Sequence, residues 1–265
     1  LESARPFVAQ MVVVDTGSSD ATPSLAEAAG AEVYHHPWEG HFSIARNHSL
    51  RYAREPWVMI LDGDEVLAEG AEEALRALDL SAEAPEAYEF IIVNFTTDRA
   101  DEREASLQQQ IRLFQRSPEH GYQGLIHNQL LHLGQRRPLQ AERCEVRVLH
   151  YGYTPSVWAA QRKDERLEML ERAVLGSPND PFHHYNLGNH LKILKRHEEA
   201  LARFLRALEL ISPLSLESPE WAPVACCSAA FCALSARQPE VASQLTTLAL
   251  EVHPHLIDAH LRAAE

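Results

Sequence analysis

Carboxylates gather in one short turn of this 265-residue sequence. An apolar, strand-like segment at residues 57–61 leads directly into Asp62, Gly63, Asp64 and Glu65. Ligands of open α/β sheets bind at the carboxyl ends of the strands, so such a strand would deliver these side chains to a binding edge. Two carboxylates one residue apart can share a hard divalent cation, which in turn neutralises a diphosphate. An ordinary acidic turn that caps a helix fits the same residues when they are taken alone.

A second segment whose residues could bind a ligand lies earlier in the chain. The apolar run at residues 10–14 ends at Asp15, and a loop of small residues, including Ser18, follows as far as Asp20. Such a loop lets a planar base or a ribose approach the backbone, although many strand-to-helix turns look similar. Because Arg46 and the acidic turn follow at suitable distances, the combination indicates a nucleotide site.

Two other phosphate-handling classes are disfavoured by the positions of the lysines. The spacing of Asp62, Asp64 and Val66 is similar to the motif of haloacid-dehalogenase phosphatases, which need a lysine later in the catalytic domain. The first lysine here is Lys163, in the helical second half of the chain. The lack of an earlier lysine also excludes a P-loop.

The elements expected to position these residues alternate between strand and helix. Apolar β-branched runs predict strands at residues 10–14, 31–34 and 57–61, with helices at 23–29, 43–53 and 69–78 between and after them. This order predicts a parallel α/β sheet. Strand patterns at 87–95, 108–115 and 145–151 have little helix between them, so we expect the sheet to acquire mixed strands.

The second half of the chain changes to a helical period from residue 156 onward. Gly188, Ala200, Phe204 and Ala207, with Pro213 beyond, follow the spacing of a tetratricopeptide (TPR) hairpin, in which small residues lie where two helices cross and an aromatic ring fills the groove. The same hairpin spacing occurs about 34 residues earlier in the chain. It occurs again near Pro254, after an insertion at 212–219. We therefore expect a helical repeat domain at 154–265 after an α/β domain at 1–153.

Composition excludes several classes of function. A formal net charge of −14 disfavours nucleic acid as a partner, since that binding depends on Lys and Arg. No apolar run is long enough for a transmembrane segment, and no signal peptide opens the chain, so we expect a cytoplasmic protein. The four cysteines lack metal-ligand spacing and are interpreted as buried thiols. The neighbouring histidines at 35–36 and 183–184 are interpreted as structural.

Taken in order, these motifs resemble family 2 glycosyltransferases that carry TPR repeats. The matching segments cover nearly the whole chain and are residues 12–20, 42–47, 61–65, 112–114, 124–127 and 150–153. The resemblance implies a GT-A (Rossmann-like) mixed-sheet domain followed by all-α repeats. It also implies transfer of a sugar from a nucleotide-sugar, most simply a UDP-sugar, to an acceptor that includes peptides in some relatives.

The resemblance also assigns roles to residues. The nucleotide-sugar would contact Asp15, Ser18, Asp20, Arg46 and Asp62. Asp64 would hold Mg²⁺ or Mn²⁺ on the diphosphate, and His127 would either contact the metal or the diphosphate or be a buried histidine bonded to the backbone. Members of the family generally invert the anomeric centre, which requires a base to deprotonate the acceptor.

That base is left open between Glu65 and Asp98. Relatives commonly have His-Glu where this chain has His127-Asn128, and an amide cannot accept the proton. The repeats would bind a peptide, a protein partner or a second subunit.

The start of the chain departs from the family pattern. Relatives begin with a strand and an Asn-Glu loop that form part of the nucleotide site, and residues 1–9 do not match them. We therefore expect an N-terminally incomplete domain whose donor binding is weak in the chain as given. The alternative function is an inactive transferase-like domain that serves as a scaffold for protein contacts through the repeats.

Overall fold

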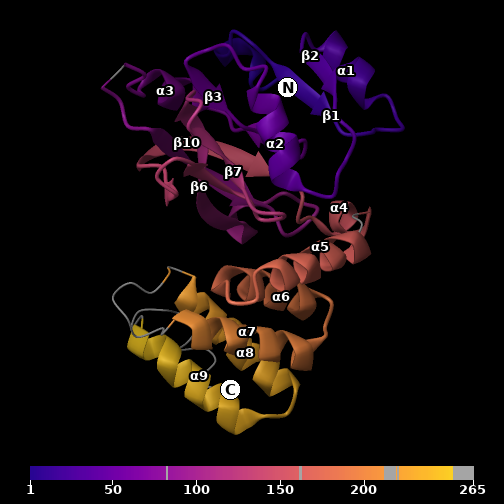
Figure 1. Ribbon diagram of the computed structural model, residues 1–265, viewed down its shortest axis with the longest axis vertical. Helices are drawn as coiled ribbons and strands as arrows, with labels where there is room; N and C mark the ends of the chain where they lie inside the picture. The colour runs from indigo at the N-terminus through magenta and orange to yellow at the C-terminus, as the bar shows by residue number, and fades with distance from the viewer. Residues whose placement is uncertain (82, 161–162, 212–218, 220, 253–265) are drawn as a thin grey trace. The chain divides into compact units, whose positions relative to one another are not determined.

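The computed structural model describes residues 1–81, 83–160, 163–211, 219 and 221–252. The chain divides into two compact units, Leu1–Gln161 and Arg162–Glu265. The first unit holds all of the strands found in the described residues, and the second is helical (Figure 1). The expected class, a mixed-sheet α/β domain followed by helical repeats, is confirmed.

The first unit begins with a short 3-10 turn, η1 (Arg5–Phe7), and a parallel pair of strands. β1 (Val12–Asp15) pairs with β2 (Glu32–His35), and α1 (Thr22–Ala28) connects them. Gly30 ends the connection at φ 88°, a left-handed conformation that glycine adopts without steric cost. The strand–helix–strand expectation for this segment is confirmed, with ends that differ by one or two residues.

Four elements lead to and from the acidic turn. In chain order they are α2 (Phe42–Leu50), β3 (Trp57–Met59), β4 (Glu65–Leu67) and α3 (Ala71–Arg76). Residues 60–64 form the turn between β3 and β4, so the carboxylates follow a strand as the sequence predicted. β4 was not anticipated, because three residues are too few to show a period.

The main sheet has five strands in the order β3-β6-β5-β10-β4. Its long strands are β5 (Ala87–Asn94), β6 (Ser106–Gln115) and β10 (Ala141–His150), and a 3-10 turn, η2 (Glu102–Glu104), precedes β6. Only the β5–β10 pair is parallel; the other neighbours are antiparallel. Phe90, Ile92, Val146 and Val148 are at most 1% exposed and form the centre of the core.

One part of the predicted topology is wrong. Alternation along the chain predicted that β1, β2 and β3 would share a parallel sheet, but β3 pairs antiparallel with β6 while β1 and β2 form a separate pair. Within the described residues, one edge of β1 and one edge of β3 have no strand partner. Alternation reports the order of elements, whereas strand adjacency depends on contacts that are distant in sequence.

A small antiparallel sheet lies after β6. It consists of β7 (His120–Gln123), β8 (Gln129–His132) and β9 (Arg137–Pro138). α2 is attached to it, because the Asn47 side chain donates to the carbonyl of Tyr122 at 2.8 Å and accepts from its amide at 2.7 Å. The sequence analysis did not anticipate these short strands.

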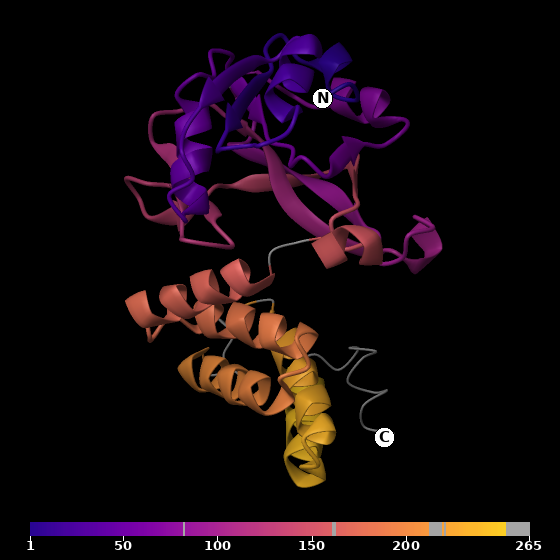
Figure 2. The same cartoon turned by 90° about the vertical axis from the view of Figure 1, so that its right-hand side faces the viewer.

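Helices follow from residue 155. α4 (Pro155–Ala160) closes the first unit, and the second contains α5 (Lys163–Gly176), α6 (Pro181–Ile193), α7 (His197–Ile211), α8 (Ala222–Ser235) and α9 (Pro239–Val252). Each helix from α5 to α8 packs on the next, as Figures 1 and 2 show. A Cβ on Gly188 would lie 2.9 Å from the Phe204 ring, so the expected close crossing of helices is present. Pro213, Pro254 and most of the expected insertion lie outside the described residues.

Three of the four cysteines match the interpretation of buried thiols, and Cys144 is half-buried. All four are free, and those on α8 are buried. Burial raises the pKa of Cys226 to about 12, which keeps it protonated at neutral pH. In the described part of the chain, the helices are all too short or too polar to span a membrane.

Candidate functional site

Two arginines from different elements hold the first carboxylate of the acidic turn. Arg46, on α2, forms an ion pair with Asp62, and its guanidinium lies 5.3 Å from the centre of the Tyr122 ring. Arg112, on β6, places Nη2 3.6 Å from the second oxygen of Asp62. Both oxygens of Asp62 therefore face positive charge, and the turn is fixed to a helix and to a strand.

Glu65 holds the turn in place through its buried carboxylate. Its side chain is 1% exposed and forms an ion pair with Arg112, whose side chain is 9% exposed. The other carboxylate oxygen of Glu65 accepts the backbone amide of Asp62 at 2.9 Å. Both oxygens are thus engaged, and β4 places Glu65 opposite His150 of β10.

Asp64 faces a histidine that the sequence analysis did not assign. His150 Nε2 lies 3.4 Å from Asp64 Oδ2, and the His150 Nδ1 atom lies 2.7 Å from the side-chain oxygen of Asn94. The interaction with His150 lowers the pKa of Asp64, so Asp64 is ionised at neutral pH. Asn94 and His150 meet because they are register partners at the carboxyl ends of the parallel strands β5 and β10.

Gly152 packs against this pair. A Cβ at this position would overlap Asp64 Oδ2 and would lie 2.6 Å from His150 Nε2. The backbone of Tyr151 also donates to the carbonyl of Asp64 at 3.0 Å. The segment after β10 therefore closes over Asp64, which remains 37% exposed.

The loop after β1 is shaped by Asp15. This buried carboxylate accepts the backbone amides of Gly17 at 3.2 Å and Ser18 at 3.2 Å. The hydrogen bonds from Ser18 lower the pKa of Asp15. The Nδ1 atom of His35 lies 3.4 Å from Asp15 Oδ2. Ser18 and Asp20 are exposed, and the side chain of Asp20 accepts the amide of Thr22 at the start of α1.

α2 connects the two parts of the site. It packs against β1, whose carboxyl end carries Asp15, and it carries Arg46, which pairs with Asp62. Its first turn is bonded to the loop after β7, through Phe42 to the carbonyl of Leu125 at 2.9 Å and through Ser43 to that of Gly124 at 2.6 Å.

The remaining predicted residues lie on loops. His127 is exposed in the loop between β7 and β8, where φ is 51°. The neighbouring Asn128 has a buried side-chain nitrogen that makes no hydrogen bond within the described residues. Asp98 is exposed after β5, and it accepts both the amide of Ser156 at 3.1 Å and its hydroxyl at 2.6 Å.

His150 and Gly152 are the site residues that sequence reasoning missed. Both belong to the segment 150–153, which was used for the family resemblance but received no role. The available signal was a histidine at the end of the strand predicted at 145–151. Its contact with Asp64 depends on β4 and on its pairing with β10, which the sequence did not reveal.

Comparison with known proteins defines the class of the first unit. Residues 3–122 match the model of Glycosyl transferase family 2. The chain thus contains a family 2 glycosyltransferase domain, and it is followed by TPR-like helices.

One curated relative is named for TPR repeats and another is named as a glycosyltransferase. A TPR repeat-containing protein of Synechococcus elongatus is 32% identical over 190 residues, which are 69% of this chain and 45% of that protein. The prophage-derived glycosyltransferase SunS of Bacillus subtilis is 22% identical over 206 residues, 76% of this chain and 47% of SunS. The chain thus spans about half the length of these relatives.

Solved TPR structures match the chain weakly. The first TPR domain of Spaghetti, solved with a peptide, has a TM-score of 0.35 at 16% identity, over 41% of this chain and 80% of that one. YrrB, described as a TPR protein with an unusual peptide-binding site, has a TM-score of 0.35 at 19% identity, over 41% of this chain and 52% of YrrB.

Proposed function

We propose that the first unit transfers a sugar from a nucleotide-sugar to an acceptor, with a divalent cation on the diphosphate. The observation that carries the proposal is the contact between Asp64 and His150 beside the arginine-held Asp62. The family 2 match at residues 3–122 supports the reaction class. The cation would be Mg²⁺ or Mn²⁺, as the family resemblance implies.

The donor atoms of Asp64 and His150 fit a cation. The Asn94 oxygen can only accept, so His150 Nδ1 carries the hydrogen and the Nε2 atom of the neutral ring is an acceptor. Nε2 lies 3.4 Å from a carboxylate oxygen of Asp64, and the hydrogen on Nε2 that lowers the pKa of Asp64 in the metal-free protein would be lost to solvent when a cation binds between the two atoms. When bound there, a divalent cation would neutralise charge that develops on the departing diphosphate. We propose that His150 joins Asp64 in this role and that His127 contacts the cation or the diphosphate.

The nucleoside would lie against the loop that Asp15 shapes. The two amides held by Asp15 fix this loop, and the exposed Ser18 and Asp20 lie on its open side. Arg46 and Asp62, which form an ion pair, would border the ribose. In this proposal Asp15, Ser18, Asp20, Arg46 and Asp62 surround the nucleotide-sugar, and the family resemblance favours a UDP-sugar.

For the catalytic base the contacts favour Asp98 over Glu65. Glu65 is buried, and both of its oxygens are already bonded, so we assign it to positioning of the turn. Asp98 is exposed, although its bonds with Ser156 lower its pKa and make it a weak base. An inverting mechanism therefore predicts that Asp98→Asn lowers kcat with little change in KM for the donor.

Thermal stabilisation by ligand tests the proposal. A ligand that binds only the folded state raises the free energy of unfolding, by about 2.7 kcal/mol when its concentration is one hundred times Kd. The melting temperature therefore rises. We expect UDP with Mn²⁺ to raise the melting temperature of a protein extended by the family's first strand and Asn-Glu loop, and Asp64→Asn in that protein to abolish this shift. Asp79→Asn, an exposed aspartate after α3, is the matched control and should retain it. An equal shift in the Asp64 variant would contradict the metal assignment.

The alternative function is a scaffold without transferase activity. It is favoured by Asn128, which stands where relatives commonly have a carboxylate, and by the Synechococcus relative being named for its TPR repeats. On α6 the ring of Tyr185 stacks on Trp221 at 4.6 Å, and such aromatic surfaces would suit a peptide or protein partner or a second subunit. Donor binding separates the two functions, because a pure scaffold would not respond to UDP and Mn²⁺.

A further inference from the structure

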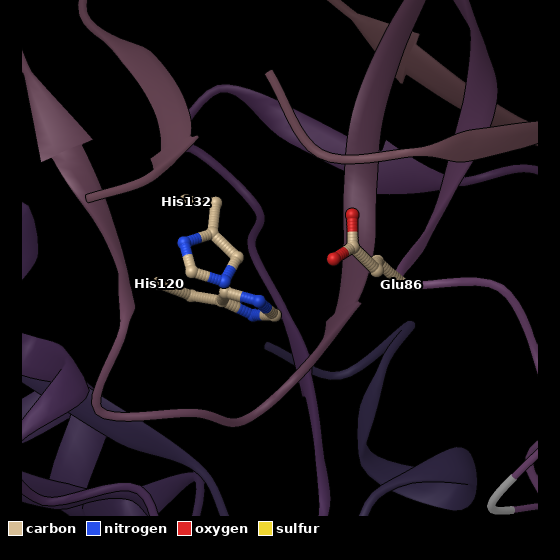
Figure 3. A group of neighbouring side chains, drawn as sticks. All are labelled: Glu86, His120 and His132. Carbon is tan, nitrogen blue, oxygen red and sulfur yellow. The ribbon is translucent and has the colours of Figure 1, made fainter. Parts of the chain in front are cut away.

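Two histidines and a glutamate converge at a place distant from the proposed donor site. His120 of β7 and His132 of β8 are direct cross-strand partners, and Glu86 immediately precedes β5. One ligand atom from each residue lies within 4.8 Å of the others. Figure 3 shows the Glu86 carboxylate directed toward the two imidazole rings.

The hydrogen bonds of His120 prepare it as a metal ligand. Its Nδ1 atom lies 2.7 Å from the carbonyl oxygen of Gln115, which can only accept. The hydrogen of the neutral ring is therefore on Nδ1, and Nε2 is left with a free lone pair. Metal-bound histidines are typically oriented in this way, by a hydrogen bond from the second nitrogen to a carbonyl or carboxylate.

His132 is held between a backbone amide and a second carboxylate. Its Nδ1 accepts the amide of Gln135 at 3.3 Å, and its Nε2 lies 2.9 Å from the carboxylate of Glu119. His132 is buried, whereas the side chain of Glu119 is 62% exposed. The exposed Glu119 can thus turn toward the space between the rings.

Glu86 supplies a fixed negative charge. Arg137 binds it through two bonds of 2.8 Å, and the amide of Gln140 donates to Oε2 at 2.7 Å. The ion pair with Arg137 lowers the pKa of Glu86 to about 2, so it is ionised. Two carboxylate oxygens offer about four lone pairs, and these three bonds leave one on Oε1 for a metal.

This cluster is separate from the proposed donor site. Glu86 precedes the first residue of β5, while Asn94, the partner of His150, is the last. The seven steps from Ala87 to Asn94 span roughly 23 Å at the usual rise of a strand. A single ion cannot serve both places.

We propose that His120, His132 and Glu86 form a second metal site, which binds Zn²⁺ or a similar transition ion. Two imidazoles with carboxylate form a ligand set that suits zinc better than magnesium. Ligands of tetrahedral zinc lie roughly 3.4 Å apart, so the side chains need to close by little more than 1 Å. Binding at His132 Nε2 moves the ring hydrogen from Nε2 to Nδ1, which gives up the 3.3 Å bond from the Gln135 amide, and Glu119 becomes the fourth ligand. The ion ties the β7–β8 hairpin to the start of β5.

Zinc titration of metal-free protein tests the site. We expect one zinc ion to bind tightly, in competition with a chromophoric chelator, and to raise the melting temperature. His120→Gln should weaken the affinity at least about tenfold, as loss of a coordinating side chain does at minimum. The double variant His120→Gln with His132→Gln should lose this zinc ion altogether. Asp64→Asn should bind zinc as the wild type does.

Two further measurements keep the test decisive if the double variant folds poorly. His120 is half-buried, so the single variant preserves the core, and Co²⁺ bound in place of zinc should lose its four-coordinate visible spectrum in that variant. His183→Gln, in the second unit, is the matched control and should retain affinity and spectrum. Equal zinc binding by wild type and His120→Gln, or an equal loss in His183→Gln, would overturn the proposal.

Discussion

The turn at residues 62–65 and the hairpin of α6 and α7 each hold a side chain at a fixed place, but they do so by different contacts. The turn is held by charge, since Asp62 and Glu65 are paired with arginines from α2 and β6. The hairpin is held by shape, because Gly188 leaves room for the Phe204 ring. Phe204 is fully buried, whereas Asp62 is 41% exposed.

This difference has consequences for stability and function. A charged network tolerates exposure and leaves ligand atoms accessible, but each buried member depends on its partner. A shape-based contact needs no partner charge, and it is damaged by added volume rather than by lost charge. Substitutions that remove a charge should therefore destabilise the turn, and substitutions that add volume should destabilise the hairpin.

The largest expected loss of stability comes from Arg112→Met. It leaves the carboxylate of Glu65, 1% exposed, without its cation, and breaking such a pair costs about 3–5 kcal/mol. Urea unfolding measures the change. Arg103→Met removes an arginine that is 89% exposed and paired with Asp101, so it should cost less than about 1 kcal/mol. Equal losses would show that the buried pair does not hold the turn.

The hairpin should respond to volume. Gly188→Leu forces the new side chain against the Phe204 ring and should cost about 2–3 kcal/mol, the upper part of the usual cost of overpacking. Gly176→Leu at the end of α5 is the control, because its Cβ would have nothing within 4 Å. Thermal unfolding of both variants gives the comparison. A wild-type melting temperature for Gly188→Leu would refute the close crossing.

A smaller, pH-dependent loss is expected for Glu86→Gln in metal-free protein. Arg137 lowers the pKa of Glu86 from 4.5 to about 2, so the pair stabilises the fold above pH 4.5. This stability is lost as the pH falls from 4.5 toward 2. After screening at a partly exposed site, the difference at pH 7 should be about 1 kcal/mol. Urea unfolding at several pH values should show it vanish in acid, and a difference that persists at pH 2 would exclude this origin.

The smallest effect on stability with a large effect on binding is expected for Gly152→Ala. The added methyl group overlaps the end of the Asp64 side chain and lies 2.6 Å from His150 Nε2. Asp64, 37% exposed, can rotate away and the His150 ring can shift, together at a cost of about 1 kcal/mol. That rotation separates Asp64 from His150. We expect near-normal urea unfolding together with strongly weakened binding of UDP and Mn²⁺. Normal binding would show that the contact between Asp64 and His150 is not needed.

The same contrast explains which contacts could be predicted from the sequence. Gly188 and Phe204 lie 16 residues apart on a repeating pattern, so the hairpin contact was predictable. The position of the acidic turn after a strand was also predicted and is confirmed. Local pattern and spacing were sufficient for both.

The contacts of the turn were not predictable in this way. His150 meets Asp64 from 86 positions away, and Arg112 meets Glu65 from 47. These pairings depend on the strand order β3-β6-β5-β10-β4, which alternation along the chain did not reveal. For the same reason the cluster of Glu86, His120 and His132 was missed, since β7 and β8 are too short to be recognised.

Calorimetric titration of UDP in the presence of Mn²⁺ tests the central claim most directly. In a protein extended by the family's first strand and Asn-Glu loop, we expect binding, loss of binding in Asp64→Asn, and retention in His120→Gln, whose histidine belongs to the other cluster. Omission of Mn²⁺ should abolish the signal in every protein. Binding that survives Asp64→Asn, or that is lost in His120→Gln while the protein remains folded, would contradict the assignment of the donor cation to Asp64 and His150.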